Sequence, residues 1–64
     1  MATRYYGAPF GADVSSDVTE AGSTTSLSVE LAVVYDATNN SRLATLRALD
    51  AIRQAIVEDT WPPA

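Results

Sequence analysis

The chain has 64 residues and a formal net charge of −4, from eight acidic residues against four arginines, with no histidine, cysteine or lysine. This composition excludes disulfides, the usual zinc sites and thiol chemistry, and it lacks the side chains that most often act as general bases or activated nucleophiles. It also lacks the basic patch of a nucleic-acid-binding domain and the basic face of a membrane-surface helix. We therefore expect no enzyme activity, no cofactor, no metal centre, and neither a nucleic-acid nor a membrane partner.

Residues 1–25 are rich in glycine, serine, threonine and alanine and show no steady periodicity, so we expect them to form an extended arm. The stretch YYGAPFG places three aromatic rings beside two glycines and a proline, which disfavour regular structure. Aromatic side chains and arginine dominate the binding energy of protein interfaces. A second aromatic docking position precedes two prolines at the C-terminus, although that ring could instead pack on the chain's own core. The predicted docking residues are Arg4, Tyr5, Tyr6, Phe10 and Trp61.

The second part of this arm, residues 12–25, is open to three interpretations. It could contain a short strand with a turn at Ala21-Gly22-Ser23, a short helix, or no regular element. If this segment were a helix, its face would carry Asp13, Asp17 and Glu20 side by side. Like charges at this spacing destabilise a helix. We favour the strand or the extended arm.

Residues 26–36, SLSVELAVVYD, alternate between apolar and polar positions, which predicts a β-strand with one apolar face. A single strand leaves unpaired backbone groups on both edges. Even if residues 12–25 pair with one edge, the other stays open, and strand addition from another chain is the simplest way to fill it. The residues predicted to form the core on this strand are Leu27, Val29, Leu31, Val33 and Tyr35.

Residues 41–59 contain no glycine or proline and many strong helix formers, which predicts a helix that begins after Asn40 or Ser41 as N-cap and ends before TWPP. At about 100° per residue the helix carries two apolar stripes rather than one. The bulky stripe supplies further core residues, namely Leu46, Leu49, Ile52 and Ile56. The small-residue stripe consists of Ala44, Ala48, Ala51 and Ala55. It would let a second copy of the helix approach closely, unless these alanines serve only as helix formers.

Together these elements predict an α+β fold with an extended N-terminal arm, one long strand that could belong to a hairpin, and one C-terminal helix. The predicted organisation is an arm over residues 1–25 and a strand–turn–helix unit over residues 26–64 with a short Trp-Pro-Pro tail. A domain of this size buries only about 60% of its unfolded surface and is marginal by itself. We therefore expect other chains to complete the sheet.

The sequence resembles small structural proteins of tailed bacteriophage virions. The resemblance lies in the aromatic arm RYYGAPFG, the stretch SSDVTEAGSTTS, the single long strand, and an alanine- and leucine-rich helix ending in EDTWPPA. It implies a capsid-decorating, head-stabilising or connector-region protein that is made in the host cytoplasm and resides in the virion. The implied partners are the major capsid protein or a connector protein, with the chain present in many copies as a homo-oligomer.

A different class of function rests on the acidic character of the chain. A small acidic regulator or inhibitor could cover a basic surface of a target protein, with Asp13, Asp17 and Glu20 as its densest charge cluster. These residues could equally be a solvated face with no partner.

Overall fold

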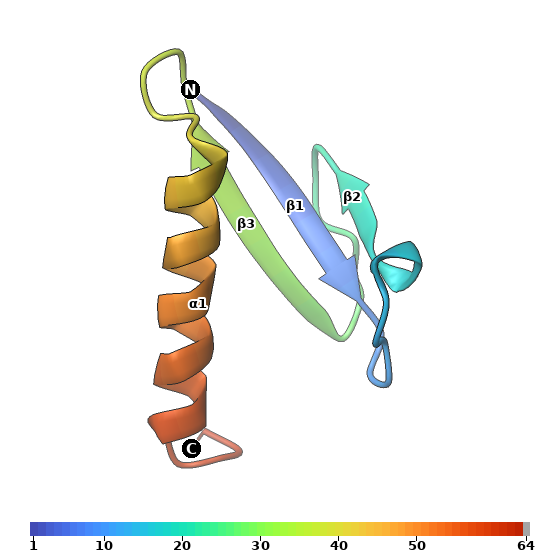
Figure 1. Cartoon of the computed structure of the whole chain (residues 1–64). Helices are drawn as coiled ribbons and strands as arrows, with labels where there is room; N and C mark the ends of the chain where they lie inside the picture. Colours follow the sequence, from blue (N-terminus) through green and yellow to red (C-terminus); the bar gives the residue numbers. More distant parts are fainter. Residues whose placement is uncertain (64) are drawn as a thin grey trace.

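The structure is a computed structural model that describes residues 1–63, and it confirms the α+β prediction (Figure 1). Three antiparallel strands form one sheet, and a single long helix follows it. In chain order the elements are β1 (Ala2–Ala8), the 3₁₀-helix η1 (Ser15–Asp17), β2 (Thr19–Ala21), β3 (Val29–Tyr35) and α1 (Arg42–Glu58).

The first residues of the predicted extended arm form a strand, β1, which lies at the centre of the sheet. The strand order is β2-β1-β3, and β1 pairs with β3 over seven positions, from Ala2 opposite Tyr35 to Ala8 opposite Val29. Strand β2 also pairs with β1, and not with β3 as the hairpin interpretation required. The inner edge of β3 is thus filled by residues 2–8 of the chain, where we had expected residues 12–25, and its outer edge stays open as predicted.

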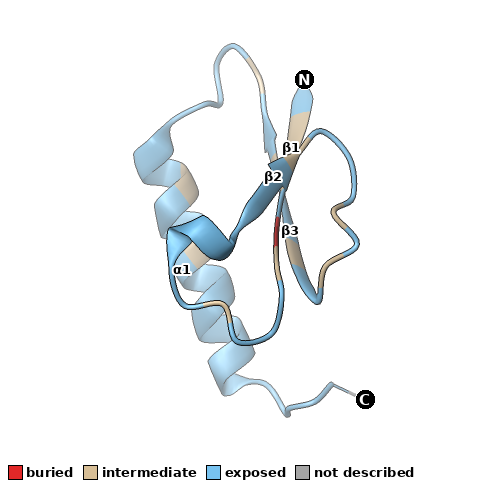
Figure 2. Cartoon of the chain, turned by 90° about the vertical axis from the view of Figure 1, so that its right-hand side faces the viewer, coloured by how far each residue is buried: buried red, intermediate tan, exposed pale blue. Residues whose placement is uncertain are grey.

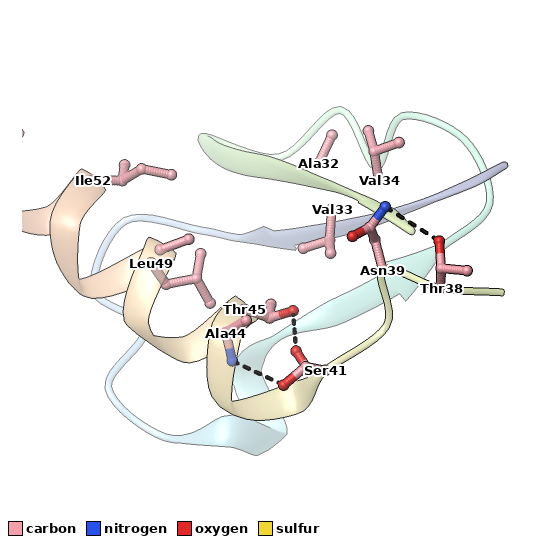
Figure 3. Close-up of a pocket in the computed structure, with 11 residues that line it drawn as sticks. Ala32, Val33, Val34, Thr38, Asn39, Ser41, Ala44, Thr45, Leu49 and Ile52 are labelled. Carbon is pink, nitrogen blue, oxygen red and sulfur yellow. Dashed lines mark hydrogen bonds between the residues drawn. The ribbon is translucent and has the colours of Figure 1, made fainter. Parts of the chain in front are cut away.

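The register divides the side chains between two faces, because directly opposite residues of an antiparallel pair point the same way. One face looks toward α1, and we call it the helix-side face. It carries Arg4, Tyr6, Val29, Leu31, Val33 and Tyr35. The opposite face, here the far face, carries Thr3, Tyr5, Gly7, Glu30, Ala32 and Val34. Figure 3 shows this division on β3, where Val33 points toward the helix while Ala32 and Val34 point away.

Gly7 is the only residue of the described part of the chain that is buried, and it appears as the short red segment in Figure 2. The side chain of Thr25 occupies the space that a Cβ atom at position 7 would need. Thr25 is held there by Glu30, which lies opposite Gly7 in the register. The Thr25 hydroxyl donates to Glu30 Oε2 at 2.6 Å, the Thr25 backbone N–H donates to the same oxygen, and the Thr24 hydroxyl donates to Oε1 at 3.0 Å. These bonds fasten the β2–β3 loop to the far face.

The β3–α1 turn is organised by one carboxylate. Asp36 Oδ1 accepts hydrogen bonds from the Thr38 N–H at 2.8 Å, the Thr38 hydroxyl at 2.9 Å and the Asn39 N–H at 2.7 Å. Ser41 then caps the helix, as one of the two predicted alternatives, because its Oγ accepts from the Ala44 N–H at 3.2 Å (Figure 3). The turn therefore sets where the helix begins relative to the end of β3.

The predicted core is not closed within the single chain. No hydrophobic side chain in residues 1–63 is buried, and in α1 only Thr45 and Leu49 are even half-covered. Of the predicted core residues, Leu27, Val33 and Leu49 are half-buried. The exposed ones are Val29, Leu31, Tyr35, Leu46, Ile52 and Ile56. The predicted strand and helix stripes do lie on surfaces that look toward each other, but the single helix does not seal the sheet.

The geometry of the two elements explains this. A helix of 17 residues is about 25 Å long, whereas the axes of three neighbouring strands span only about 10 Å. The helix runs at a marked angle to the strands in Figure 1, so its C-terminal half extends past the sheet. Both half-covered helix residues accordingly belong to its first half.

Substitution of Gly7 tests the close approach of the loop to the sheet. We expect Gly7→Ala to lower the free energy of unfolding by about 1–3 kcal/mol, because the added methyl group overlaps the Thr25 side chain. Urea denaturation measures this difference. Gly22→Ala is the matched control, since nothing lies within 4 Å of a Cβ there. The double variant Gly7→Ala with Thr25→Gly should recover part of the loss, and equal losses at Gly7 and Gly22 would contradict the packing argument.

Candidate interaction surface

The most prominent feature of the molecule is its exposed apolar surface. The chain exposes 5290 Å², whereas a compact protein of its mass of 6.8 kDa exposes about 4,000 Å². The excess is about 1,300 Å² per chain. Large apolar side chains supply much of the exposed area on both the sheet and the helix, including Tyr6, Val29, Leu31 and Val34 on the sheet and Leu46, Ile52, Ile56 and Val57 on the helix. Exposed large apolar side chains on both elements mark a candidate site of protein association.

A groove of about 360 Å³ runs between the outer edge of β3 and the helix (Figure 3). Its strand wall is formed by Ala32, Val33 and Val34, and its helix wall by Ala44, Ala48 and Ile52 among others. Residues from both faces of the sheet line it, so the groove passes around the edge of β3. This edge has no neighbouring strand within the chain, because β3 is the last strand in the order β2-β1-β3.

A second hollow of about 570 Å³ lies between the helix-side face and the helix, on the side of the helix away from the groove. Tyr6, Val33 and Tyr35 line it from the sheet, and Leu46 and Leu49 from the helix, with Arg42 at its margin. Val33, Tyr35, Leu46 and Leu49 belong to the predicted core, whereas Tyr6 was predicted as a docking residue.

The predicted docking residues do not act as one arm. Arg4 and Tyr5 are half-buried within β1, and Tyr6 contributes to the helix-side face. The Arg4 Nη1 atom lies 3.9 Å from Glu20 Oε1 in a solvent-exposed ion pair, an arrangement that contributes little to stability. Phe10 and Trp61 remain strongly exposed, at 82% and 64% of their full accessible surface. The structure therefore separates the predicted set into strand residues and two exposed aromatic rings.

Phe10 owes its exposure to a turn that the sequence pattern contains. Gly11 has a φ of +92°, and the Ala12 N–H donates to the Pro9 carbonyl at 3.2 Å. This is the arrangement of a type II turn, which requires a positive φ at its third residue and therefore favours glycine there. The turn holds Phe10 at its corner, directed away from the sheet's interior contacts.

The alanine stripe is exposed along its whole length. Ala44, Ala48, Ala51 and Ala55 are all exposed, and the first two line the groove beside β3. The sequence identified the stripe, but it gave no sign that the stripe stands next to an open strand edge. That neighbourhood depends on the angle at which the β3–α1 turn directs the helix.

The acidic cluster does not converge on one point. The Asp13 N–H donates to Asp17 Oδ2 at 3.3 Å, across the 3₁₀-helix, whereas Glu20 lies on β2 and faces Arg4. Across residues 1–63 no three acidic side chains gather closely enough to hold a metal ion. In the same part of the chain, no helix combines the length and the hydropathy that a membrane span requires.

Two carboxylates have shifted titration because the backbone and hydroxyl groups around them donate to the charged form. The hydrogen bond from the Thr25 hydroxyl, followed by that from the Thr25 backbone, lowers the pKa of Glu30 below its ordinary value. The backbone N–H groups of Asn39 and Thr38 lower the pKa of Asp36 in the same way. Both groups organise loops, and neither lies in the groove.

Comparison with known proteins gives no relatives: no family model, no curated protein and no solved structure matches the chain. The class that the geometry defines is a small α+β protein with a long open edge on β3 and a largely uncovered helix.

Acid titration tests the structural role of Glu30. The folded pKa lies below the ordinary value of 4.5, so the native state binds fewer protons than the unfolded chain. The stabilisation is complete above that value and is lost as the pH falls through the folded pKa. We expect thermal or urea stability to decline as the pH falls below the ordinary value of 4.5, and Glu30→Gln to be less stable at pH 6 with a shallower decline. Asp50→Asn, an exposed helix position, is the control and should keep the wild-type slope.

Proposed function

We propose that the chain is a non-enzymatic structural protein that works within a multi-chain assembly. The observation that supports this is the exposure of large apolar side chains on the sheet and the helix, in a chain whose total exposed surface is about 1,300 Å² greater than that of a compact protein of its mass. Exposed apolar surface of this kind is typical of a face that binds another chain. None of the side-chain arrangements described above forms a catalytic group or a metal site that would favour another function.

The assembly that we propose is the virion of a tailed bacteriophage, in which the chain docks on a capsid or connector surface. This part rests on the resemblance in sequence style described above. In this setting Phe10 and Trp61 are the docking residues, because they are rings held away from the sheet while Tyr5 is taken up by β1. Phe10 is the stronger anchor, since the turn around Gly11 fixes its position before binding and lowers the entropy lost on docking.

Mass spectrometry of purified particles tests this function. Particles released by cells that express the chain from its natural locus should contain it in many copies after density-gradient purification. Phe10→Ala should reduce the bound amount by roughly tenfold or more, in line with the loss of an aromatic hot spot. Val14→Ala, which shortens another exposed apolar side chain, is the control and should leave the amount unchanged. Particles that lack the wild-type chain would overturn the virion assignment.

A further inference from the structure

We infer that the first partner of this chain is a second copy of itself, joined through the groove beside β3. In this dimer the two β3 strands pair antiparallel across a two-fold axis, and the two α1 helices lie antiparallel on the helix-side face with their alanine stripes in contact. The inference deepens the proposed function, on which it rests, by naming the chain that covers the open surface.

The β3 edge is the better of the two sheet edges for strand addition. The opposite edge, on β2, is only three residues long, and short edges are a common protection against pairing. Strand β3 offers seven residues, VELAVVY, without proline or lysine. Its one charged side chain, Glu30, is bound to Thr24 and Thr25 on the far face and does not guard the edge. Pairing two such edges converts two three-stranded sheets into one continuous sheet.

The position of the helix also indicates that the partner is a second copy of the chain. Helix α1 extends past its own sheet, so its uncovered second half, with Ile52 and Ile56, lacks a surface to pack on. A two-fold axis beside β3 places the partner's sheet in that position. By the same symmetry, the helix of the second copy packs on the helix-side face of the first copy, where Leu31 and Tyr6 are exposed. Each helix thereby completes the core of the other copy.

The alanine stripe has the symmetry that an antiparallel pair requires. A two-fold axis centred between residues 49 and 50 brings Ala44 opposite Ala55 of the second copy and Ala48 opposite its Ala51. All four contacts across the axis are therefore alanine against alanine. Small side chains permit the close approach of two helix backbones, and Ala44 and Ala48 already form the helix wall of the groove.

The charges of the helix agree with an antiparallel partner. Arg42 opens α1 and Glu58 ends it, followed by Asp59, and the helix has no acidic residue in its first turn and no basic residue in its last. This order opposes the helix macrodipole, which favours acids at the N-terminus and bases at the C-terminus. In the proposed register Arg42 lies near Glu58 and Asp59 of the second copy at both ends of the pair. A neighbouring copy thus supplies the counter-charges that the single helix lacks.

The area also fits. A stable interface of standard size buries about 800 Å² per partner, and obligate homodimers bury more. The excess exposed surface of this chain, about 1,300 Å², lies in the obligate range. Two-fold dimers are also the commonest closed assemblies of identical chains.

Light scattering on the purified chain tests the dimer. We expect a mass of twice 6.8 kDa for the wild type. Ala48→Glu should shift the mass to a single chain, because it places carboxylates in the apolar contact between helices. Gln54→Glu adds the same charge on another side of the helix and should stay dimeric. A monomeric wild type would overturn the dimer while leaving particle association to be judged separately by the purified-particle measurement.

Cysteine cross-linking tests the arrangement without relying on a destabilised variant. The natural chain has no cysteine, so an introduced thiol reports on one contact. An equimolar mixture of Ala48→Cys and Ala51→Cys chains should form a covalent heterodimer under mild oxidation, since the facing residues come within disulfide reach. A mixture of Gln54→Cys and Ala51→Cys should not. Equal cross-linking in both mixtures, or none in the first, would overturn the antiparallel helix contact.

Discussion

The pairing of β1 with β3 is the interaction on which the rest of this structure depends. Seven consecutive residue pairs fix the register, and the register decides which side chains share a face. It places Gly7 opposite Glu30, and the absence of a side chain at Gly7 lets Thr25 reach the Glu30 carboxylate. The same pairing turns β3 into an edge strand, since β1 occupies its inner side. The long β1–β3 pairing thus fixes the sheet and leaves the outer edge of β3 unpaired.

The small size of the sheet limits what the helix can do within one chain. Three strands give a face much narrower than the helix is long, so the second half of the helix extends past the sheet and stays uncovered. The β3–α1 turn around Asp36 and the Ser41 cap determine where along the sheet this coverage begins. Hydrogen bonds in the sheet, the loops and the turn hold the backbone in place, while most of the apolar surface remains exposed. Association with another chain that covers these apolar side chains would therefore also stabilise the fold.

The proposed dimer and the proposed virion role assign different surfaces to different partners. The alanine stripe is suited to an identical chain, because its pattern is symmetric about one point on the helix, and the open β3 edge lies beside it. Phe10 and Trp61 lie outside that pattern and are suited to a larger, different surface. A protein that first closes its own core by pairing and then docks through rigid aromatic residues would remain soluble until it meets its assembly. Both steps use burial of apolar area, and neither requires a reactive side chain.

The sequence by itself determined the two long elements, their apolar stripes, a helix cap at Asn40 or Ser41, and the alanine stripe, because alternation and helical periodicity are local properties of the chain. It also indicated that one edge of β3 stays open. It did not show that residues 2–8 form the central strand, since glycine and proline near the aromatic rings suggested an arm, and pairing with a strand more than twenty residues away leaves little local signal. Only the tertiary structure decided the strand order, the burial of Gly7 beneath Thr25, and the meeting of the β3 edge with the alanine stripe. Those features depend on the angle of one turn and on contacts between distant residues, which no local pattern encodes.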